Sequence, residues 1–190
     1  IRLIDPGEKK IDILDFFDLN DRKYPFLLES VAKGSARARY SILFCNPKTK
    51  LIKKKNERTN FLKKLDKEWQ VNRIEQEKIL VEGKEIDLPF LGGWFVYLGY
   101  ELVSEIEESL RLPNSPYKLP TAFASRVESA IIYDQQENIL YLISEGSEES
   151  INGMQKDYED LKKNKKNNYL KKKNWIYKKR IGFTTSKRYK

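Results

Sequence analysis

The stretch ESAIIYDQQENILYLIS, residues 128–144, indicates the fold more clearly than any other part of the chain. It contains two runs rich in β-branched and aromatic residues, 128–134 and 138–144, which three polar residues separate. Such runs with a short polar connection predict two antiparallel strands joined as a β-hairpin. The hairpin places the chain among proteins that contain antiparallel sheet.

Two runs nearer the start of the chain predict a second strand pair. YPFLLESV (24–31) is a compact apolar run, and ARYSILFC (38–45) alternates enough to form a strand. We expect these runs to pair across an intervening turn, and the chain to continue as a polar edge strand over 48–55. The earlier run IDILDFF (11–17) fits a short strand and a helical turn equally well.

The most apolar stretch of the chain is LPFLGGWFVYLGYELVSEIEESL (88–110). Bulky residues at almost every position of GGWFVYLGY predict a strand that is covered on both faces. The glycines at positions 92, 93 and 99 lack the spacing of a dinucleotide-binding loop, and no Gly-Lys-Ser/Thr follows them. We therefore interpret these glycines as sites of close packing and not as a phosphate-binding loop.

Two segments carry the pattern of helices. Residues 60–69 place apolar side chains at helical spacing with lysines outside, which predicts an amphipathic helix. Residues 101–110 are rich in helix formers, and Glu105, Glu107 and Glu108 form either the solvated face of a helix or, as the alternative, magnesium ligands. Strands and helices together predict an α+β fold with antiparallel strands.

The positive charge of the protein is concentrated at the end of the sequence. The 190 residues have a formal net charge of +9, but residues 151–190 alone contain 14 Lys and Arg against 3 Asp and Glu. The basic segment interleaves lysines with asparagines and a few aromatics, which suit contacts with phosphates and bases. Lys outnumbers Arg, however, and no nucleic-acid-binding motif accompanies the run. We therefore favour a polar helix over 150–170 and a linker over nucleic-acid binding.

Cysteine and histidine usage excludes several kinds of chemistry within this sequence. Cys45 is the only cysteine and histidine is absent, which excludes internal disulfides, Cys/His zinc sites and His-based catalysis. Cys45 ends an apolar run without an adjacent base, so we expect a buried small residue and not a nucleophile. No apolar run approaches the roughly 20 residues that a membrane helix needs. We therefore expect no membrane insertion and a cytoplasmic protein.

Several sequence motifs follow one another in a fixed order along the chain. In that order, they are LLES (27–30), RYS (39–41), PFLGGWFVYLGYEL (89–102) and the two runs of the hairpin at 128–144. In this order they resemble the N-terminal part of a family of chorismate-using enzymes, component I of anthranilate synthase and of aminodeoxychorismate synthase. The resemblance covers about residues 24–144, and FTTSKRY (183–189) resembles the segment that opens the family's chorismate-binding half.

The resemblance implies a layered α/β/β/α sandwich and a division of the sequence. An N-terminal domain is expected over 1–150, a Lys/Asn-rich helix and linker over 151–182, and the truncated start of the chorismate-binding catalytic domain over 183–190. Because the sequence opens at Ile1 and ends within a patterned segment, we expect a piece of a longer chain. The family's catalytic and magnesium-binding residues lie beyond Lys190, so no catalytic residue and no metal ligand is assigned here. Magnesium is expected in the parent enzyme only.

The two branches of the family differ in the position that they aminate. Aminodeoxychorismate synthase replaces the C4 hydroxyl of chorismate on the route to 4-aminobenzoate and folate, whereas anthranilate synthase aminates C2 and eliminates pyruvate. Two segments resemble the aminodeoxychorismate branch more closely in sequence: ARARYSILFCNP (36–47) and GGWFVYLGYELVSEIEESLRLP (92–113). Ser41 matches the anthranilate branch. We expect an aminodeoxychorismate synthase, with anthranilate synthase as the alternative.

The resemblance also implies an effector site for L-tryptophan. The matching residues are Leu28, Glu29, Ser30, Arg37, Ala38, Arg39 and Tyr40. A zwitterion needs acceptors for its ammonium, donors for its carboxylate and apolar packing for its ring, and this set offers all three. The alternative is that Leu27, Leu28 and Tyr40 belong to the core and that Arg39 pairs with Glu29.

The partners implied by the family are chorismate, bound by the catalytic half, and a glutamine amidotransferase subunit that supplies ammonia. Two other classes of function remain open at this point. One is a stand-alone regulatory module that binds an amino acid. The other is a basic nucleic-acid-binding domain, which requires binding that weakens with salt.

Overall fold

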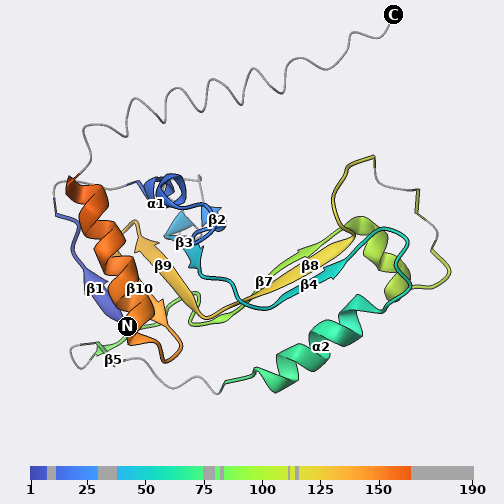
Figure 1. The fold of residues 1–190 in the computed structure, drawn as a ribbon. Coiled ribbons are helices and arrows are strands. Elements are labelled where there is room, and N and C mark those ends of the chain that lie inside the picture. The colour runs from blue at the N-terminus through green and yellow to red at the C-terminus, as the bar shows by residue number, and fades with distance from the viewer. Residues whose placement is uncertain are drawn as a thin grey trace, which may run out of the picture.

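The computed structural model describes residues 1–7, 12–29, 38–74, 80–81, 84–110, 112–113 and 116–163. Within these ranges the chain forms two antiparallel sheets that follow one another along the molecule, each with helix on one side (Figure 1). A ribbon of β5 (Leu80–Val81) and β6 (Lys84–Glu85) is a third, two-stranded sheet. The predicted α+β class, with mostly antiparallel sheet and flanking helices, is confirmed.

The larger sheet contains both predicted strand pairs. Its order is β1 (Arg2–Ile4), β10 (Ile139–Ser144), β9 (Ser129–Asp134), β3 (Tyr40–Cys45) and β2 (Phe26–Glu29). All neighbours are antiparallel. The predicted hairpin is β9 and β10, and the predicted strand pair is β2 and β3. Their pairing through β3 and β9 places two largely buried strands near the centre of the sheet.

One face of the larger sheet is covered by two helices, α1 (Leu14–Leu19) and a helix whose described part spans 148–163. The helix over 148–163 buries side chains spaced three and four residues apart, which form one apolar stripe. The stripe packs on alternate residues of the strands. The residues of the stripe are Ile151, Met154, Tyr158 and Leu161, and the strand residues in the same core are Leu43, Ile131 and Leu142. The structure has a helix where one was predicted over 150–170, but the prediction that this helix is polar was wrong, because one of its sides is apolar and buried. Residues 164–170 lie outside the described ranges.

The ambiguous run 11–17 is resolved in favour of helix from Leu14 onwards, because Phe16 is fully buried against Tyr24. The two rings meet edge to face with centroids 5.5 Å apart. The opposite face of the sheet buries Ala130, Ile132 and other side chains beneath the segment around Leu88.

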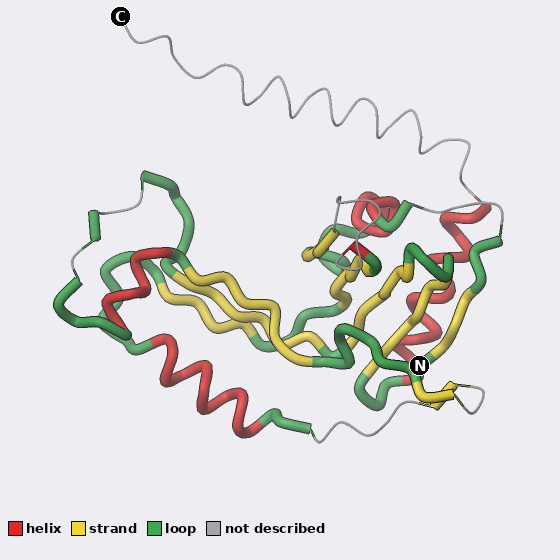
Figure 2. Tube along the Cα trace, turned by 180° about the vertical axis from the view of Figure 1, so that it is seen from behind, coloured by secondary structure: helices red, strands yellow, loops and turns green. Residues whose placement is uncertain are grey.

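The smaller sheet has the order β4 (Lys50–Lys53), β8 (Ala122–Val127) and β7 (Gly93–Leu98). As predicted, β4 is a polar edge strand. The strand β7 is the other edge, and its Val96 and Leu98 are 40% and 52% exposed. The prediction that 92–100 is covered on both faces was therefore wrong, because Val96 and Leu98 lie on the same face of the strand and that face is partly open. Figure 2 shows α2 (Phe61–Val71) running along this sheet.

The helix α2 confirms the predicted amphipathic helix at 60–69. Its first residue is preceded by Asn60, whose side-chain oxygen accepts a hydrogen bond from the Lys63 amide at 2.8 Å. The Glu105 carboxylate accepts two more amide N–H groups of the first turn, those of Phe61 and Leu62, each at 2.9 Å. A distant side chain thus satisfies donors that a helix start otherwise leaves unpaired.

The segment that supplies Glu105 is the 3₁₀ helix η2 (Tyr100–Glu105) and not the α-helix predicted for 101–110. Ile106 and Leu110 are 75% and 46% exposed, so no burial stabilises a longer helix there. Glu105 itself is 7% exposed and forms an ion pair with Lys53, so it belongs neither to a solvated face nor to a metal site. Its burial raises the pKa of the carboxyl, but the amide donors and Lys53 outweigh that effect and leave the pKa below its usual value.

The two sheets are continuous through their strands. Only Glu128 separates β8 from β9, and only residues 46–49 separate β3 from β4. Across this passage the Lys48 amide donates to the Arg126 carbonyl at 2.9 Å, and the Arg126 amide donates to the Thr49 carbonyl at 2.8 Å.

A row of aromatic rings also connects the sheets. Phe26 of β2 stacks on Phe95 of β7 with ring centroids 4.1 Å apart and planes 4° apart. Phe44 of β3 meets both Phe90 and Phe95 edge to face. These contacts join strands of the larger sheet to a strand of the smaller one.

Several sequence predictions fall on residues outside the described ranges. They are the part of the Lys/Asn-rich helix and linker from residue 164 onwards and the start of the catalytic domain at 183–190. The proposed boundaries at 150 and 182 remain predictions. None of the helices in the described part of the chain is both long and apolar enough to span a membrane.

Replacing Glu105 with Ala tests the anchoring of α2. The variant leaves two amides of the helix start and the nearly buried Lys53 without their acceptor. We expect the free energy of unfolding, measured by urea denaturation, to fall by about 2–4 kcal/mol. The exposed Glu107→Ala is the matched control and should change it by less than about 0.5 kcal/mol. Equal stabilities of the two variants would contradict the role assigned to Glu105.

Candidate functional site

The sequence-predicted effector residues lie on the outer strand pair of the larger sheet. Leu28 and Glu29 end β2, while Arg39 precedes β3 and Tyr40 begins it. The register places Leu28 opposite Ile42. Ala38 is buried, and the remaining two predicted residues, Ser30 and Arg37, lie outside the described ranges.

The strand pair divides these residues between the two faces of the sheet. Successive side chains of a strand point to opposite faces, so Leu28 and Tyr40 share one face and Glu29 lies on the other. Leu28 is 51% exposed and Tyr40 is half-buried. The structure therefore brings an apolar side chain and an aromatic ring together, and it does not place the Glu29 carboxylate beside them.

Arg39 pairs with Asp134 of β9. Its Nε and Nη2 atoms donate to Oδ2 of Asp134 at 2.8 and 2.6 Å. The other oxygen of this carboxylate accepts the amides of Gln136 and Glu137 at 3.0 and 3.2 Å. The alternative that Arg39 pairs with Glu29 was wrong, because Asp134 provides a fully buried carboxylate next to it in the sheet.

The Arg39 and Tyr40 side chains form a cation next to an aromatic face. The guanidinium carbon lies 4.9 Å from the ring centroid, and the Arg39 side chain is 36% exposed. The hydrogen bonds that Arg39 donates to Asp134 raise the pKa of Arg39. Burial raises the pKa of Tyr40, although the Arg39 charge opposes that rise, so the phenol is neutral at pH 7. An exposed guanidinium beside a neutral ring can hold a carboxylate and pack an aromatic group.

Cys45 lies in the core at the end of β3. Its side chain is fully buried, and burial raises the pKa of the thiol to about 12. Since the thiolate is the nucleophilic form, the prediction of an inert buried residue is confirmed. Within the described ranges no three His, Cys, Asp or Glu side chains gather closely enough to hold a metal ion.

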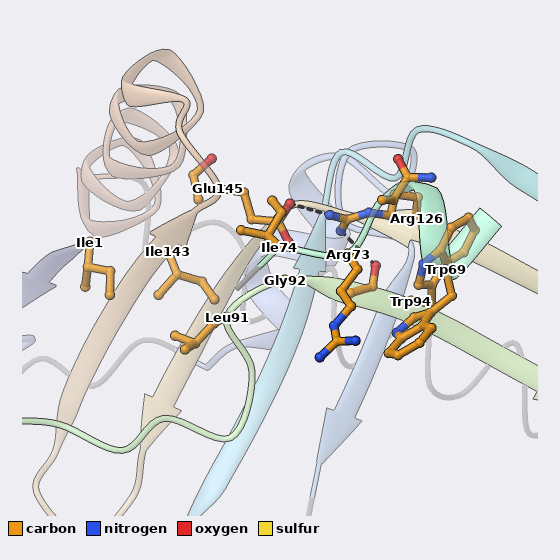
Figure 3. Close-up of a pocket in the computed structure, with 13 residues that line it drawn as sticks. Ile1, Trp69, Arg73, Ile74, Leu91, Gly92, Trp94, Arg126, Ile143 and Glu145 are labelled. Carbon is orange, nitrogen blue, oxygen red and sulfur yellow. Dashed lines mark hydrogen bonds and ion pairs between the residues drawn. The ribbon is translucent and has the colours of Figure 1, made fainter. Parts of the chain in front are cut away.

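A concave region that the sequence did not indicate lies where the two sheets meet. It is a cleft of about 930 Å³, lined from the smaller sheet, the end of α2 and the larger sheet (Figure 3). Its residues include Trp69, Arg73, Trp94, Arg126, Ile143 and Glu145. We call it the inter-sheet cleft.

Arg126 of β8 is the central polar residue of the inter-sheet cleft. It is 5% exposed, and its Nη1 donates to the carbonyls of Gly93 and Val127 at 3.0 and 2.9 Å. Its Nη2 forms an ion pair with Glu145, which follows β10. One guanidinium therefore links the backbone of the smaller sheet to a carboxylate of the larger one.

Gly92 makes room for that ion pair. A Cβ atom at this position would overlap the Glu145 carboxylate. The φ angle of +141° is one that residues other than glycine rarely adopt. At Gly99 a Cβ would approach the Thr121 carbonyl oxygen to 2.8 Å. Both observations agree with the interpretation of these glycines as sites of close packing.

Asp134 variants test the structural role of the Arg39 partner. Asp134→Ala removes an acceptor of four hydrogen bonds, and we expect the free energy of unfolding to fall by about 2–4 kcal/mol. Asp134→Asn keeps one amide oxygen as an acceptor and should lose less. Urea denaturation measures both, with the exposed Asp18→Ala as the control. A stability of Asp134→Ala equal to that of the control would contradict the assignment.

Comparison with known proteins gives two curated relatives and a solved structure, while no family model matches the chain. Anthranilate synthase component 1 of Synechocystis sp. is 30% identical over 132 residues, which are 66% of this chain and 26% of the relative. Anthranilate synthase component 1 of Acetivibrio thermocellus is 31% identical over 125 residues, which are 62% of this chain and 25% of the relative. The chain thus spans about a quarter of the length of these relatives.

A solved structure with the same enzyme name as these relatives has a similar fold. The crystal structure of anthranilate synthase component I from Streptococcus pneumoniae superposes with a TM-score of 0.51 at 22% identity, over 84% of this chain and 36% of that one. At this identity the superposition shows a shared fold. The sequence comparisons thus show similarity to anthranilate synthase component 1 over part of this chain, and the superposition shows the fold.

Proposed function

We propose that this chain is a non-catalytic part of a chorismate-aminating enzyme. The observation that carries the proposal is the agreement between two independent comparisons: the curated relatives and the structural neighbour are all component I of anthranilate synthase. The motif order that resembles the family's N-terminal part supports the same conclusion. The described residues form a core and an exposed strand pair, and none of them is assigned a catalytic role.

The remainder of the parent enzyme would perform the chemistry. Magnesium, expected in the parent enzyme only, would supply positive charge to that chemistry, and no residue of this chain is proposed to hold it. Ammonia would come from a glutamine amidotransferase subunit. The role proposed for this chain is to support that catalytic part and to bind an effector.

Two reactions remain for the parent enzyme, and one observation favours each. The amino-acid sequence of residues 36–47 and 92–113 favours the formation of 4-amino-4-deoxychorismate for 4-aminobenzoate and folate synthesis. The names of both curated relatives, together with Ser41, favour anthranilate formation for tryptophan synthesis. The product itself distinguishes the two.

We further propose that L-tryptophan binds at the ends of β2 and β3. The partly exposed Arg39 guanidinium, which also pairs with Asp134, would donate to the carboxylate of the amino acid through N–H groups that do not bond to Asp134, and Tyr40 and Leu28 would pack against its indole. Because Glu29 lies on the other face of the sheet, the ammonium needs another acceptor. Backbone carbonyls at the edge of the strand and groups from the catalytic part are the candidates.

The enzymatic assignment is tested by assaying product formation from chorismate, ammonium and Mg²⁺. The full-length product of the reading frame is expected to form either anthranilate or 4-amino-4-deoxychorismate, separated by chromatography. The 190-residue chain alone is expected to give no product above the blank. Turnover by the chain alone, or the absence of any amination by the full-length product, would overturn the proposal.

The effector site is tested by calorimetric titration of the full-length product with L-tryptophan. Tyr40→Ala is expected to raise the Kd about fivefold, because it removes the ring against which the indole packs. The matched control is Tyr100→Ala, at a residue that begins η2 and is 91% exposed. Unchanged affinity in Tyr40→Ala would show that the indole binds elsewhere.

A further inference from the structure

The strand β7 has an edge that none of the described strands covers, since it pairs with β8 alone. Gly99 and Thr121 stand opposite each other just beyond this pairing, and the Gly99 amide donates to the Thr121 carbonyl at 2.8 Å. Bonded and non-bonded pairs alternate along two antiparallel strands. The backbone N–H and C=O groups of Trp94, Val96 and Leu98 therefore point away from β8, towards the open edge.

The side chains of β7 are apolar on both faces of the smaller sheet. Trp94, Val96 and Leu98 project from the face on which α2 lies, and Val96 and Leu98 are 40% and 52% exposed. Phe95 and Tyr97 project from the other face, where both rings stack on the same phenylalanine of β8. An added strand would thus find apolar contacts on either side of the sheet.

The apolar surface of β7 continues towards α2. A cavity of about 300 Å³ is lined by Trp94 and Val96 of β7 and, among other residues, by Leu65 and Trp69 of α2. Trp69 is 44% exposed. Exposed apolar surface beside an uncovered strand edge is typical of a site where another chain binds.

The absence of charge distinguishes β7 from the other edge strands of the two larger sheets. Those strands carry Arg2 on β1, Glu29 on β2, and Lys50 and Lys53 on β4. Charged side chains on an edge strand oppose pairing with another chain. The sequence of β7, GWFVYL, contains neither a charged residue nor a proline, so this edge has none of these protections.

We propose that β7 is the interface between two copies of this chain, whose β7 strands pair antiparallel about a two-fold axis at Val96. Charge is the argument for a second copy. A strand that pairs with itself places any charge near the axis opposite a like charge, and β7 avoids this repulsion because it is uncharged. An acidic or basic strand from another protein would find no complementary charge on β7.

The backbone pattern of β7 determines the register. With the axis at Val96, this residue faces Val96 of the second copy, and Trp94 faces Leu98. All of these residues point their backbone groups outward, so each pair exchanges both of its hydrogen bonds. A shift by one residue would instead place them opposite residues that already bond to β8. On the other face of the sheet, Phe95 would pack beside Tyr97 of the second copy.

This interface is separate from the proposed tryptophan site and does not depend on the proposed enzymatic reaction. Leu28, Glu29, Arg39 and Tyr40 lie on or beside β2 and β3 of the larger sheet. A result at β7 therefore leaves the effector proposal unaffected.

A disulfide between two copies of Val96→Cys tests the register in the 190-residue chain. Opposite residues of a bonded antiparallel pair have Cα atoms about 5.5 Å apart, a distance that a disulfide spans. We expect this variant to form a covalent dimer under mild oxidation, seen by non-reducing gel electrophoresis. Ile52→Cys, 47% exposed on the edge strand β4, is the matched control and should remain monomeric. Cys45 is fully buried and does not compete. Equal crosslinking of both variants would overturn the interface.

Sedimentation velocity of the same chain, from micromolar to submillimolar concentration, tests the association without a covalent bond. We expect a monomer–dimer equilibrium whose Kd rises about tenfold in Val96→Lys, because two like charges then stand directly opposite each other. Ile52→Lys is the control and should leave the Kd unchanged. Circular dichroism checks the fold of each variant, and the disulfide comparison decides alone if Val96→Lys unfolds.

Two outcomes of the sedimentation experiment would overturn the proposal. One is a Val96→Lys variant that is folded and dimerises as tightly as the parent chain. The other is a parent chain that stays monomeric at every concentration, which would leave the remainder of the parent enzyme as the better candidate for covering β7.

Discussion

The arrangement of the two sheets depends on the contacts of one buried guanidinium. Arg126 holds the backbone at Gly93 and Val127 of the smaller sheet and the carboxylate of Glu145 at the end of the larger one. These contacts tie the two sheets together where the strands pass from one to the other. The Phe26–Phe95 stack and the inter-sheet cleft are also formed by residues from the two sheets.

The sequence predicted those elements whose stability comes from local patterns. The hairpin, the strand pair and α2 each carry a periodicity or a cap that neighbours in the sequence provide. The 3₁₀ helix η2 was mistaken for an α-helix because helix propensity is a weak preference that tertiary burial overrides. Nothing within 101–110 reveals that Ile106 and Leu110 have no surface to pack against.

The candidate sites were harder to predict because their contacts join distant residues. Arg39 and Asp134 stand 95 positions apart, and the carboxylate next to Arg39 is known only once β3 pairs with β9. The resemblance to a family predicted effector residues that fall on or beside β2 and β3, and the effector site itself stays a prediction. The resemblance could not supply the faces of the residues, and the alternation along β2 separates Leu28 from Glu29. Trp69 was expected to be part of a helix core, yet the sequence contains no signal for the cleft that exposes it.

The passage from β8 to β9 through Glu128 alone has a consequence for how this fold tolerates change in length. An extra residue in the hairpin turn at 135–138 lengthens a loop and leaves both strands as they are. An extra residue at Glu128 would instead rotate β9 by one side-chain position relative to β8. Ile131 and Ile132 would then exchange the two faces of the sheet, and every contact of both cores would be lost at once. Insertions and deletions in related chains should therefore collect in the turn and avoid the passage between the sheets.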